Sequence, residues 1–337
     1  MRPPRTGEVI QTQTFDDTRP NDGERDISDG VLERPRGTVL ACFHDDWEVL
    51  LSSGEIVRAS VRARHFADLP KDQKLIAAGD RVAVDDDGGG TWIIEEVLPR
   101  ATVLSRLLPG RRHETEQVIV ANAAQLVAVA SLKHPPFNRR RLDRFLVIAE
   151  AAGLESVVAL NKIDLVDEGS WAEARSVYER AGYAVVPTCA LDGRGVAELA
   201  GHLDGRLSVL AGASGAGKSS LLNAIEPGLG IRVREVSEKT DKGKHTTTNV
   251  RVFPLQSGAL VADTPGFREL GFWRVSADDL RGFFPEFREL AAACRFRTCS
   301  HSVEPGCAVL EAVRAGEIDS GRHDSYLRLL RQLRGSN

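Results

Sequence analysis

Gly212-Ala-Ser-Gly-Ala-Gly217-Lys218-Ser219 is the stretch from which the architecture of this chain can be worked out. It fits the pattern G-x-x-x-x-G-K-[ST], in which glycines let backbone N–H groups converge on phosphate oxygens. The apolar run Leu207–Leu210 precedes it, and a helix-competent stretch, Lys218–Ala224, follows it. A strand, a glycine-rich loop and a helix in this order predict a phosphate-binding loop and make an incidental glycine-rich turn a poor explanation.

The residues of this loop have separate expected roles. Lys218 should reach the β- and γ-phosphates of a nucleotide, which also makes it a catalytic candidate, and the Ser219 hydroxyl should bind Mg²⁺. The loop backbone should surround the phosphates. The nucleotide-binding residues expected here are Gly212, Ala213, Ser214, Gly215, Ala216, Gly217, Lys218, Ser219 and Ser220.

A second phosphate motif lies downstream. Asp263-Thr-Pro-Gly266 follows the apolar run Ala259–Ala262. An aspartate at the end of a strand beside a phosphate loop is placed to hold Mg²⁺ through water, and Gly266 can offer its backbone N–H to the γ-phosphate. The tetrapeptide alone would indicate only a turn. Beside a phosphate loop, it predicts part of the same site.

A base-reading motif lies upstream. Asn161-Lys162-Ile163-Asp164 follows the apolar run Val157–Leu160. Asp164 would accept hydrogen bonds from the guanine N1–H and exocyclic amine, donors that adenine lacks in that geometry. The Lys162 stem would pack over the base plane, and Asn161 would tie loops together. In isolation a strand-to-loop turn would explain this tetrapeptide better, but together with two phosphate motifs it predicts guanine-nucleotide binding. Thr188–Ala190 ends another apolar run, and the Ala190 N–H could contact guanine O6.

The three motifs occur in a rotated order. In most GTP-binding domains the N-K-x-D string comes last, whereas here it precedes the phosphate loop. Such a circular permutation is physically acceptable because the termini of a domain often lie close together. Residues 101–275 alternate apolar runs with helical segments, which predicts an α/β domain with a parallel sheet. The expected strands are Gln125–Ala130, Ser156–Leu160, Ala184–Val186, Leu207–Leu210 and Ala259–Ala262, and the expected helices are Arg141–Ala152, Trp171–Ala181, Gly195–Leu203 and Lys218–Ala224.

Two further segments precede this α/β domain. Residues 1–33 are polar and acidic without periodicity, which predicts a disordered tail; an interaction arm is the alternative. Residues 34–100 hold five short β-prone runs separated by turns, which suits an OB-type β-barrel. By its pattern alone, this barrel could bind nucleic acid or serve as a spacer.

The C-terminal segment, residues 276–337, combines helical pieces with a cysteine cluster. Cys294-x4-Cys299-x-His301-x5-Cys307 supplies three sulfur ligands and one imidazole. This is a complete tetrahedral set for one structural Zn²⁺, with no open position for catalysis. Buried free cysteines with a surface histidine are the alternative. The chain has five cysteines, and an odd number argues against a disulfide framework.

Composition narrows the choice of partners. The chain has 337 residues, a formal net charge of -4, 42% hydrophobic and 27% charged residues. These are values of an ordinary globular protein, so any RNA surface must be a local patch. No apolar run approaches the roughly 18 residues typical of a membrane span, and no secretory core is visible at the N-terminus. We therefore expect a cytoplasmic protein with no membrane partner.

The permuted motif order, the β-rich N-terminal segment and the C-terminal Cys/His pattern together resemble the RsgA (YjeQ) family of circularly permuted GTPases. The resemblance runs from about Arg36 to the C-terminus. It implies an OB-fold, a permuted P-loop GTPase core and a helical zinc-binding domain. It further implies a role in late maturation of the small (30S) ribosomal subunit, with rRNA, GTP and GDP as partners, hydrolysis stimulated by that subunit and release after hydrolysis. We expect a monomer.

The hydrolytic residue is harder to assign. Many GTPases place a glutamine directly after D-x-x-G, but Phe267 stands there and cannot orient water. Similarity to the family string G-R-H-T-T favours Thr246 or Thr247, and Thr247 in particular, for contact with Mg²⁺ and γ-phosphate. His245 is a candidate proton relay, with an exposed loop histidine as an equal alternative. Two other functions stay open: a nucleotide-gated RNA-binding switch with negligible turnover, and an ATP-dependent enzyme, which Asp164 disfavours.

Overall fold

The structure is a computed structural model that describes residues 35–43, 46–61, 76–108, 115–231, 250–263 and 274–335. The tail expected over residues 1–33 lies outside these ranges. So do the loop residues His245, Thr246 and Thr247, and the pair Gly266 and Phe267.

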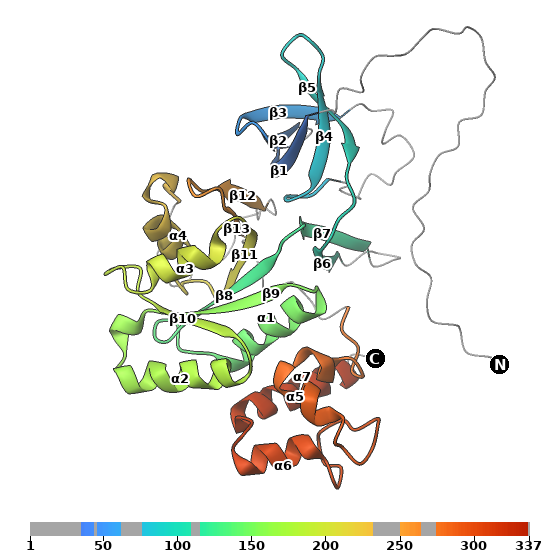
Figure 1. Ribbon diagram of the computed structural model, residues 1–337, viewed down its shortest axis with the longest axis vertical. Coiled ribbons are helices and arrows are strands. Elements are labelled where there is room, and N and C mark those ends of the chain that lie inside the picture. The colour runs from blue at the N-terminus through green and yellow to red at the C-terminus, as the bar shows by residue number, and fades with distance from the viewer. Residues whose placement is uncertain are drawn as a thin grey trace, which may run out of the picture. The chain divides into compact units, whose positions relative to one another are not determined.

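The N-terminal part of the described chain is a closed five-stranded barrel with the strand order β1-β2-β3-β5-β4 (Figure 1). Its strands are β1 (Arg36–Phe43), β2 (Asp46–Leu51), β3 (Ile56–Val61), β4 (Arg81–Asp86) and β5 (Trp92–Val97). Small and branched side chains such as Val39, Val49 and Val82 fill the interior and are fully buried. Strands β3 and β5 pair in parallel and the other neighbours are antiparallel. The predicted five-stranded barrel is confirmed.

The central sheet has six strands in the order β10-β9-β8-β11-β13-β12. They are β8 (Gln125–Ser131), β9 (Glu155–Asn161), β10 (Ala184–Thr188), β11 (Leu207–Gly212), β12 (Arg251–Pro254) and β13 (Leu260–Asp263). All are parallel except the edge strand β12, which runs antiparallel to β13. The five predicted strands are parallel, as expected, and the antiparallel edge strand β12 was not anticipated. A tight turn closed by the Leu255 N–H and the Ala259 carbonyl (2.8 Å) joins β12 to β13, and such a short connection joins only antiparallel neighbours.

Helices cover both faces of this sheet because successive strand residues point to opposite sides. On β8, Leu126 and Ala128 pack with helices α1 (Arg139–Ala151) and α2 (Glu168–Arg180). The intervening Val127 and Val129 pack with α3 (Val196–Leu203) and α4 (Lys218–Ile225). The short 3-10 turns η2 (Ile163–Leu165) and η3 (Pro227–Leu229) complete this α/β layer. Strands buried on both faces explain why these segments are almost continuously apolar.

Polar caps set the starts of two of these helices. The Asn138 side chain accepts a hydrogen bond from the Arg141 N–H (3.0 Å) at the start of α1. The Asp167 side chain does the same for the Ser170 N–H (2.9 Å) at the start of α2. Each side chain satisfies a backbone donor that has no partner inside the helix. These caps explain why both helices begin two or three residues before the apolar periodicity suggests.

Two smaller elements flank the sheet. Strands β6 (Val103–Leu108) and β7 (Thr115–Ala121) form a two-stranded antiparallel sheet that was not anticipated. The C-terminal part consists of η5 (Leu280–Phe283), α5 (Pro285–Ala291), α6 (Ala308–Ala315) and α7 (Ser320–Gly335). Its own apolar core includes Phe284, Phe287 and Tyr326. No helix within the described ranges is long and apolar enough to cross a bilayer.

Candidate nucleotide site and metal centre

The parallel strands bring the three motifs to one edge of the sheet. Strand β9 ends at Asn161, β11 ends at Gly212 and β13 ends at Asp263. The strand register places Thr188 beside Asn161, and Leu210 beside Asp263. Ligands of open α/β sheets bind at the carboxyl ends of the strands, so these motifs share the edge at which a nucleotide is expected.

Backbone geometry explains the glycines of the phosphate loop. Gly215 and Gly217 have φ values of +76° and +98°, a region that favours glycine. A Cβ atom on Gly217 would lie 2.2 Å from the Asn161 Nδ2 atom. Helix α4 begins directly after this residue, at Lys218. The loop can therefore approach Asn161 closely and still direct the first N–H groups of α4 toward an anion.

Asn161 and Lys162 hold the phosphate loop in place. The Asn161 Nδ2 group donates to the Ala216 carbonyl (2.8 Å), and the Lys162 ammonium donates to the Gly215 carbonyl (2.8 Å) and to the His134 carbonyl. The Thr188 hydroxyl donates to the Asn161 Oδ1 atom (3.2 Å). The contacts of Asn161 with Ala216 and of Lys162 with Gly215 thus connect two loops that are more than fifty positions apart in the sequence. Such a connection between loops is what the sequence predicted for Asn161.

Lys218, next to the glycine-rich loop, and Asp263, at the end of β13, carry opposite charges and interact electrostatically. The Lys218 ammonium donates to the carbonyls of Gly212 (3.1 Å) and Ala213 (3.3 Å). Burial lowers the pKa of Lys218, and the Asp263 carboxylate opposes that shift. Burial raises the pKa of Asp263, and Lys218 opposes it in turn. Ser219 and Ser220, both half-buried, occupy the first turn of α4 beside this pair.

The base-reading side contains a contact that the sequence did not indicate. Asp164 is exposed on η2, and its Oδ1 atom lies 3.2 Å from the Cys189 thiol, which donates to it. Cys189 is 1% exposed, and burial raises its pKa. Its position directly after Thr188 at the end of β10 was the available signal. Ile163, also predicted to belong to this site, is buried, and Ala190 is half-buried next to the thiol.

Several predicted residues cannot be placed against this geometry. His245, Thr246 and Thr247 fall between β12 and η3, and Gly266 follows β13, all outside the described residues. Their roles stay predictions. The described parts of the three motifs nevertheless lie together at one edge of one sheet.

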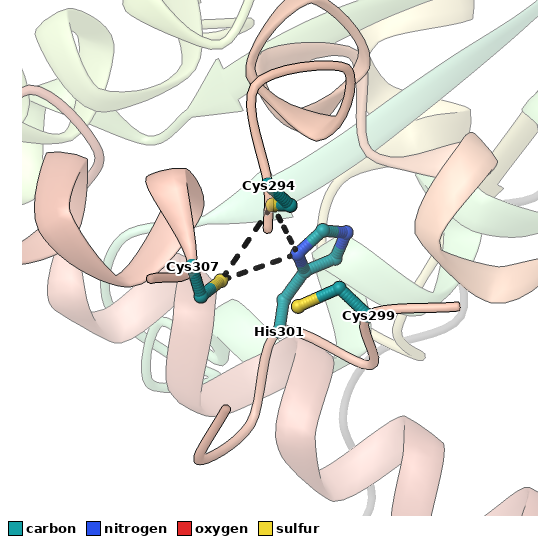
Figure 2. Close-up of side chains that lie close together, drawn as sticks. All are labelled: Cys294, Cys299, His301 and Cys307. Carbon is teal, nitrogen blue, oxygen red and sulfur yellow. Dashed lines mark hydrogen bonds between the residues drawn. The ribbon is translucent and has the colours of Figure 1, made fainter. Parts of the chain in front are cut away.

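The four predicted metal ligands converge. Figure 2 shows the side chains of Cys294, Cys299, His301 and Cys307 turned toward a common centre, and their ligand atoms all lie within 4.8 Å of one another. The His301 Nδ1 atom is 3.6 Å from the Cys294 sulfur and 3.4 Å from the Cys307 sulfur, and the two sulfurs are 3.9 Å apart. Tetrahedral zinc with ordinary bond lengths requires about 3.6 Å between N and S and about 3.8 Å between sulfurs. The observed edges therefore fit such an ion.

The chemistry of these ligands also suits a cation. Cys299, His301 and Cys307 are buried. Burial raises the pKa of Cys299 to about 12 and also raises that of Cys307, whereas it lowers the pKa of His301. A neutral imidazole is already the ligating form. Buried thiols need a nearby positive charge before they lose their protons, and a dication supplies it. The cluster is thus a candidate structural metal site.

The fold and these motifs together define a class of protein. A phosphate loop follows β11, while the base-reading string follows β9, earlier in the chain. The chain therefore has a circularly permuted P-loop GTPase fold, with a five-stranded barrel before it and a Cys3His cluster after it.

Comparison with known proteins agrees with this class. A family model described as RsgA GTPase matches residues 97–273. The chain is 44% identical over 301 residues to a Gemmatimonas aurantiaca protein named small ribosomal subunit biogenesis GTPase RsgA, covering 89% of this chain and 97% of that protein. A protein of the same name from Chlorobaculum parvum is 43% identical over 266 residues, covering 77% of this chain and 86% of the relative. The chain belongs to the RsgA GTPase family.

Solved structures resemble the whole described fold. The crystal structure of YjeQ from Thermotoga maritima superposes with a TM-score of 0.71 at 35% identity, covering 90% of this chain and 99% of that one. The structure of YloQ, titled a circularly permuted GTPase, gives a TM-score of 0.70 at 28% identity, covering 93% of this chain and 99% of that one. The predicted permutation is therefore confirmed at the level of the fold.

Proposed function

We propose that this protein hydrolyses GTP during late maturation of the small (30S) ribosomal subunit, binds the rRNA of that particle and leaves it after hydrolysis. The observation that carries the proposal is the contact of the Asn161–Asp164 loop with the phosphate loop, at the sheet edge where Asp263 also ends its strand. The names of the relatives supply the ribosomal partner. We also propose that the protein is cytoplasmic and monomeric.

Each side chain at the edge has a proposed task. Asp164 accepts the guanine N1–H and exocyclic N–H bonds, because it is exposed and its carboxylate is already held from one side by Cys189. Lys162 lies against the base with its stem while its ammonium holds Gly215. Lys218 turns from the loop carbonyls toward the β- and γ-phosphates, where its charge opposes the negative charge that develops in the transition state.

Magnesium is the proposed cofactor of the nucleotide. Ser219 would bind the ion directly, and Asp263 would hold it through water, since both belong to the loops that meet at this edge. When bound, Mg²⁺ neutralises phosphate charge. Thr247 is proposed as a further contact to the ion and the γ-phosphate, and Gly266 as a backbone donor. His245 is proposed to move a proton from the attacking water.

The metal cluster is proposed to hold one structural zinc ion. Three cysteines and a histidine form a complete zinc ligand set, and their ligand atoms converge in the structure. We also propose the division of the chain into a tail (1–33), a barrel (34–100), a GTPase domain (101–275) and a zinc domain (276–337). Metal analysis of the purified protein should give one zinc per chain, and a value near zero would refute the site.

A basic and aromatic patch suited to RNA lies in the C-terminal part of the described chain. Arg295, Phe296 and Arg297 are exposed between two metal ligands, and the Arg295 guanidinium lies 5.4 Å from the Phe296 ring centroid. Within the described residues neither arginine is ion-paired. By contrast, Arg139 and Arg140, at the start of α1, pair with Asp319 and Asp324. Free arginines beside an exposed ring suit phosphates and a stacked base.

The decisive experiment is GTP hydrolysis titrated with purified small and large ribosomal subunits. We expect small subunits alone to accelerate phosphate release. Lys218→Ala should abolish turnover, and His245→Ala should slow it while leaving GDP affinity near that of the wild type. Equal effects of both subunits would refute the proposed partner. Unchanged stimulated turnover in His245→Ala would refute its role.

A second function is favoured by one residue. Phe267 stands where a glutamine would orient the attacking water. The protein could therefore be a nucleotide-gated RNA-binding switch with negligible turnover. In that case a non-hydrolysable GTP analogue would still promote binding to small subunits, while phosphate release would stay at the unstimulated rate.

A further inference from the structure

The loop that carries two of the metal ligands is organised around one carboxylate. Between Cys299 and Cys307, the backbone N–H groups of Ser300, Ser302 and Val303 all donate to the Glu304 side chain, at 2.8, 2.9 and 3.0 Å. The Ser300 hydroxyl donates to the same carboxylate at 2.6 Å. Both oxygens of Glu304 are thus occupied by donors of its own loop.

The carbonyl groups of this loop are held from the other side. The Tyr326 hydroxyl donates to the Ser300 carbonyl (2.7 Å), and the His323 Nε2 group donates to the His301 carbonyl (2.8 Å). Both donors belong to α7. Protein groups therefore fix the backbone around His301 on both sides, independently of any metal.

His301 needs this support for two reasons. Its φ value of +52° is unfavourable for a residue with a Cβ atom and persists only where surrounding contacts impose it. Metal-bound histidines are ordinarily oriented by a hydrogen bond from their second ring nitrogen. Here the Nε2 atom of His301 is buried and has no hydrogen-bond partner among the described residues. The ring is instead packed against Phe287, with centroids 5.8 Å apart. Its direction therefore depends on the backbone that Glu304 holds.

We propose that Glu304 is a positioning residue of the metal centre. Its carboxylate fixes the backbone of the loop so that Cys299 and His301 face the ion, and it does not bind the ion itself. The ligand atoms of Cys294, His301 and Cys307 already lie at separations that fit a tetrahedral ion, and the Cys299 sulfur lies within 4.8 Å of them (Figure 2). The loop is consequently pre-organised, which reduces the ordering that metal binding must impose. The inference rests on the proposed metal but is independent of the ribosomal role.

The test measures zinc affinity of the full-length protein by competition with a chromophoric chelator. Glu304→Gln keeps the size of the side chain but replaces one acceptor oxygen with a donor that faces N–H groups. We expect a loss of about 10- to 100-fold in zinc affinity, the range for residues that support metal ligands. Glu311→Gln, an exposed substitution in the first turn of α6, is the matched control and should stay within about twofold of wild type.

A second readout separates positioning from ligation. Saturating Co²⁺ should give the same visible spectrum in wild type and Glu304→Gln, because the three sulfurs and the imidazole are unchanged. A zinc affinity within twofold of wild type, or an altered cobalt spectrum at saturation, would overturn the proposal. If Glu304→Gln does not fold, Ser300→Ala removes the 2.6 Å hydroxyl contact to the carboxylate, together with the 2.7 Å contact to the Ser302 hydroxyl, and leaves the carboxylate itself in place. That variant should lose about 2- to 10-fold in affinity, and no loss would overturn the proposal equally. Absence of zinc from the wild type would instead refute the metal site itself.

Discussion

Replacing Arg322 by methionine should destabilise the protein more than any surface substitution. Arg322 on α7 is 1% exposed, and its Nη1 atom donates to Asp143 on α1 at 2.7 Å. Its Nε and Nη2 atoms form a two-point contact with Glu286 on α5, at 2.8 and 3.0 Å. The guanidinium also lies 4.7 Å from the Phe284 ring centroid. One cation therefore compensates two buried carboxylates from different helices.

The size of the effect follows from what the substitution leaves behind. Methionine fills most of the volume but leaves Asp143, fully buried, and Glu286, nearly so, without their cation. Breaking a buried pair in this way costs about 3–5 kcal/mol. The exposed pair of Arg175 and Glu179 on α2 is the matched control, since i,i+4 surface pairs contribute only about 0.3–0.5 kcal/mol. Domains are stable by about 5–15 kcal/mol, so the Arg322 effect should be large.

Urea unfolding of zinc-loaded protein, followed by far-ultraviolet circular dichroism, measures this difference. Arg322→Met should unfold at a clearly lower urea concentration than wild type, and Arg175→Met should not. The triple variant Arg322→Met, Asp143→Asn, Glu286→Gln should recover part of the lost stability because no unpaired charge remains. Equal midpoints for Arg322→Met and Arg175→Met would refute the reasoning.

Three further predictions concern the nucleotide and RNA surfaces. Asp164→Asn should weaken GTP binding about 10- to 100-fold in an equilibrium binding assay and should favour xanthosine triphosphate, because an amide can donate to the xanthine oxygen. An unchanged preference for GTP over xanthosine triphosphate would contradict the base-reading role. Gly217→Ala should reduce GTP affinity strongly, since its Cβ would lie 2.2 Å from the Asn161 amide, whereas Gly258→Ala, with φ +82° but open space around it, should leave binding intact. Comparable losses of GTP affinity in both variants would mean that strain at a positive φ, and not the close approach to Asn161, causes the effect. Phe296→Ala should weaken binding of labelled single-stranded RNA about 5- to 100-fold, as measured by fluorescence anisotropy, and Phe296→Leu should weaken it to a similar extent. If neither substitution changes RNA affinity, this patch is not part of the RNA interface.

Much of the architecture can be inferred from local pattern. The phosphate loop predicts a strand before it and a helix after it, and α4 begins at Lys218 as expected. Strand β1, Arg36–Phe43, lies within the segment for which the sequence predicts five short strands. The cluster of three cysteines and a histidine was predicted from its spacing together with the family resemblance, and the four side chains do converge in the structure. These features depend on residues a few positions apart.

Other elements were not predicted, because the sequence signals of short strands are weak. Strand β12 has four residues and a proline, so neither its existence nor its antiparallel direction could be inferred from periodicity. The β6–β7 pair was also not anticipated, although the turn signal Pro109-Gly110 separates the two strands in the sequence. Short strands gain their stability from neighbours in the sheet, and those neighbours are far away in the chain.

The amino-acid order alone establishes which motifs the chain possesses: a G-x-x-x-x-G-K-S loop, an N-K-x-D string placed before it, and three cysteines with a histidine close together in the sequence. Folding in three dimensions selects their partners, such as the Asn161 amide against Ala216, the Cys189 thiol against Asp164, and Arg322 between Asp143 and Glu286. Turns and helix starts arise from interactions within one or two turns of backbone, which a linear pattern records. Contacts between residues 25 to 179 positions apart form only when strands and helices pack, and no local pattern encodes that packing.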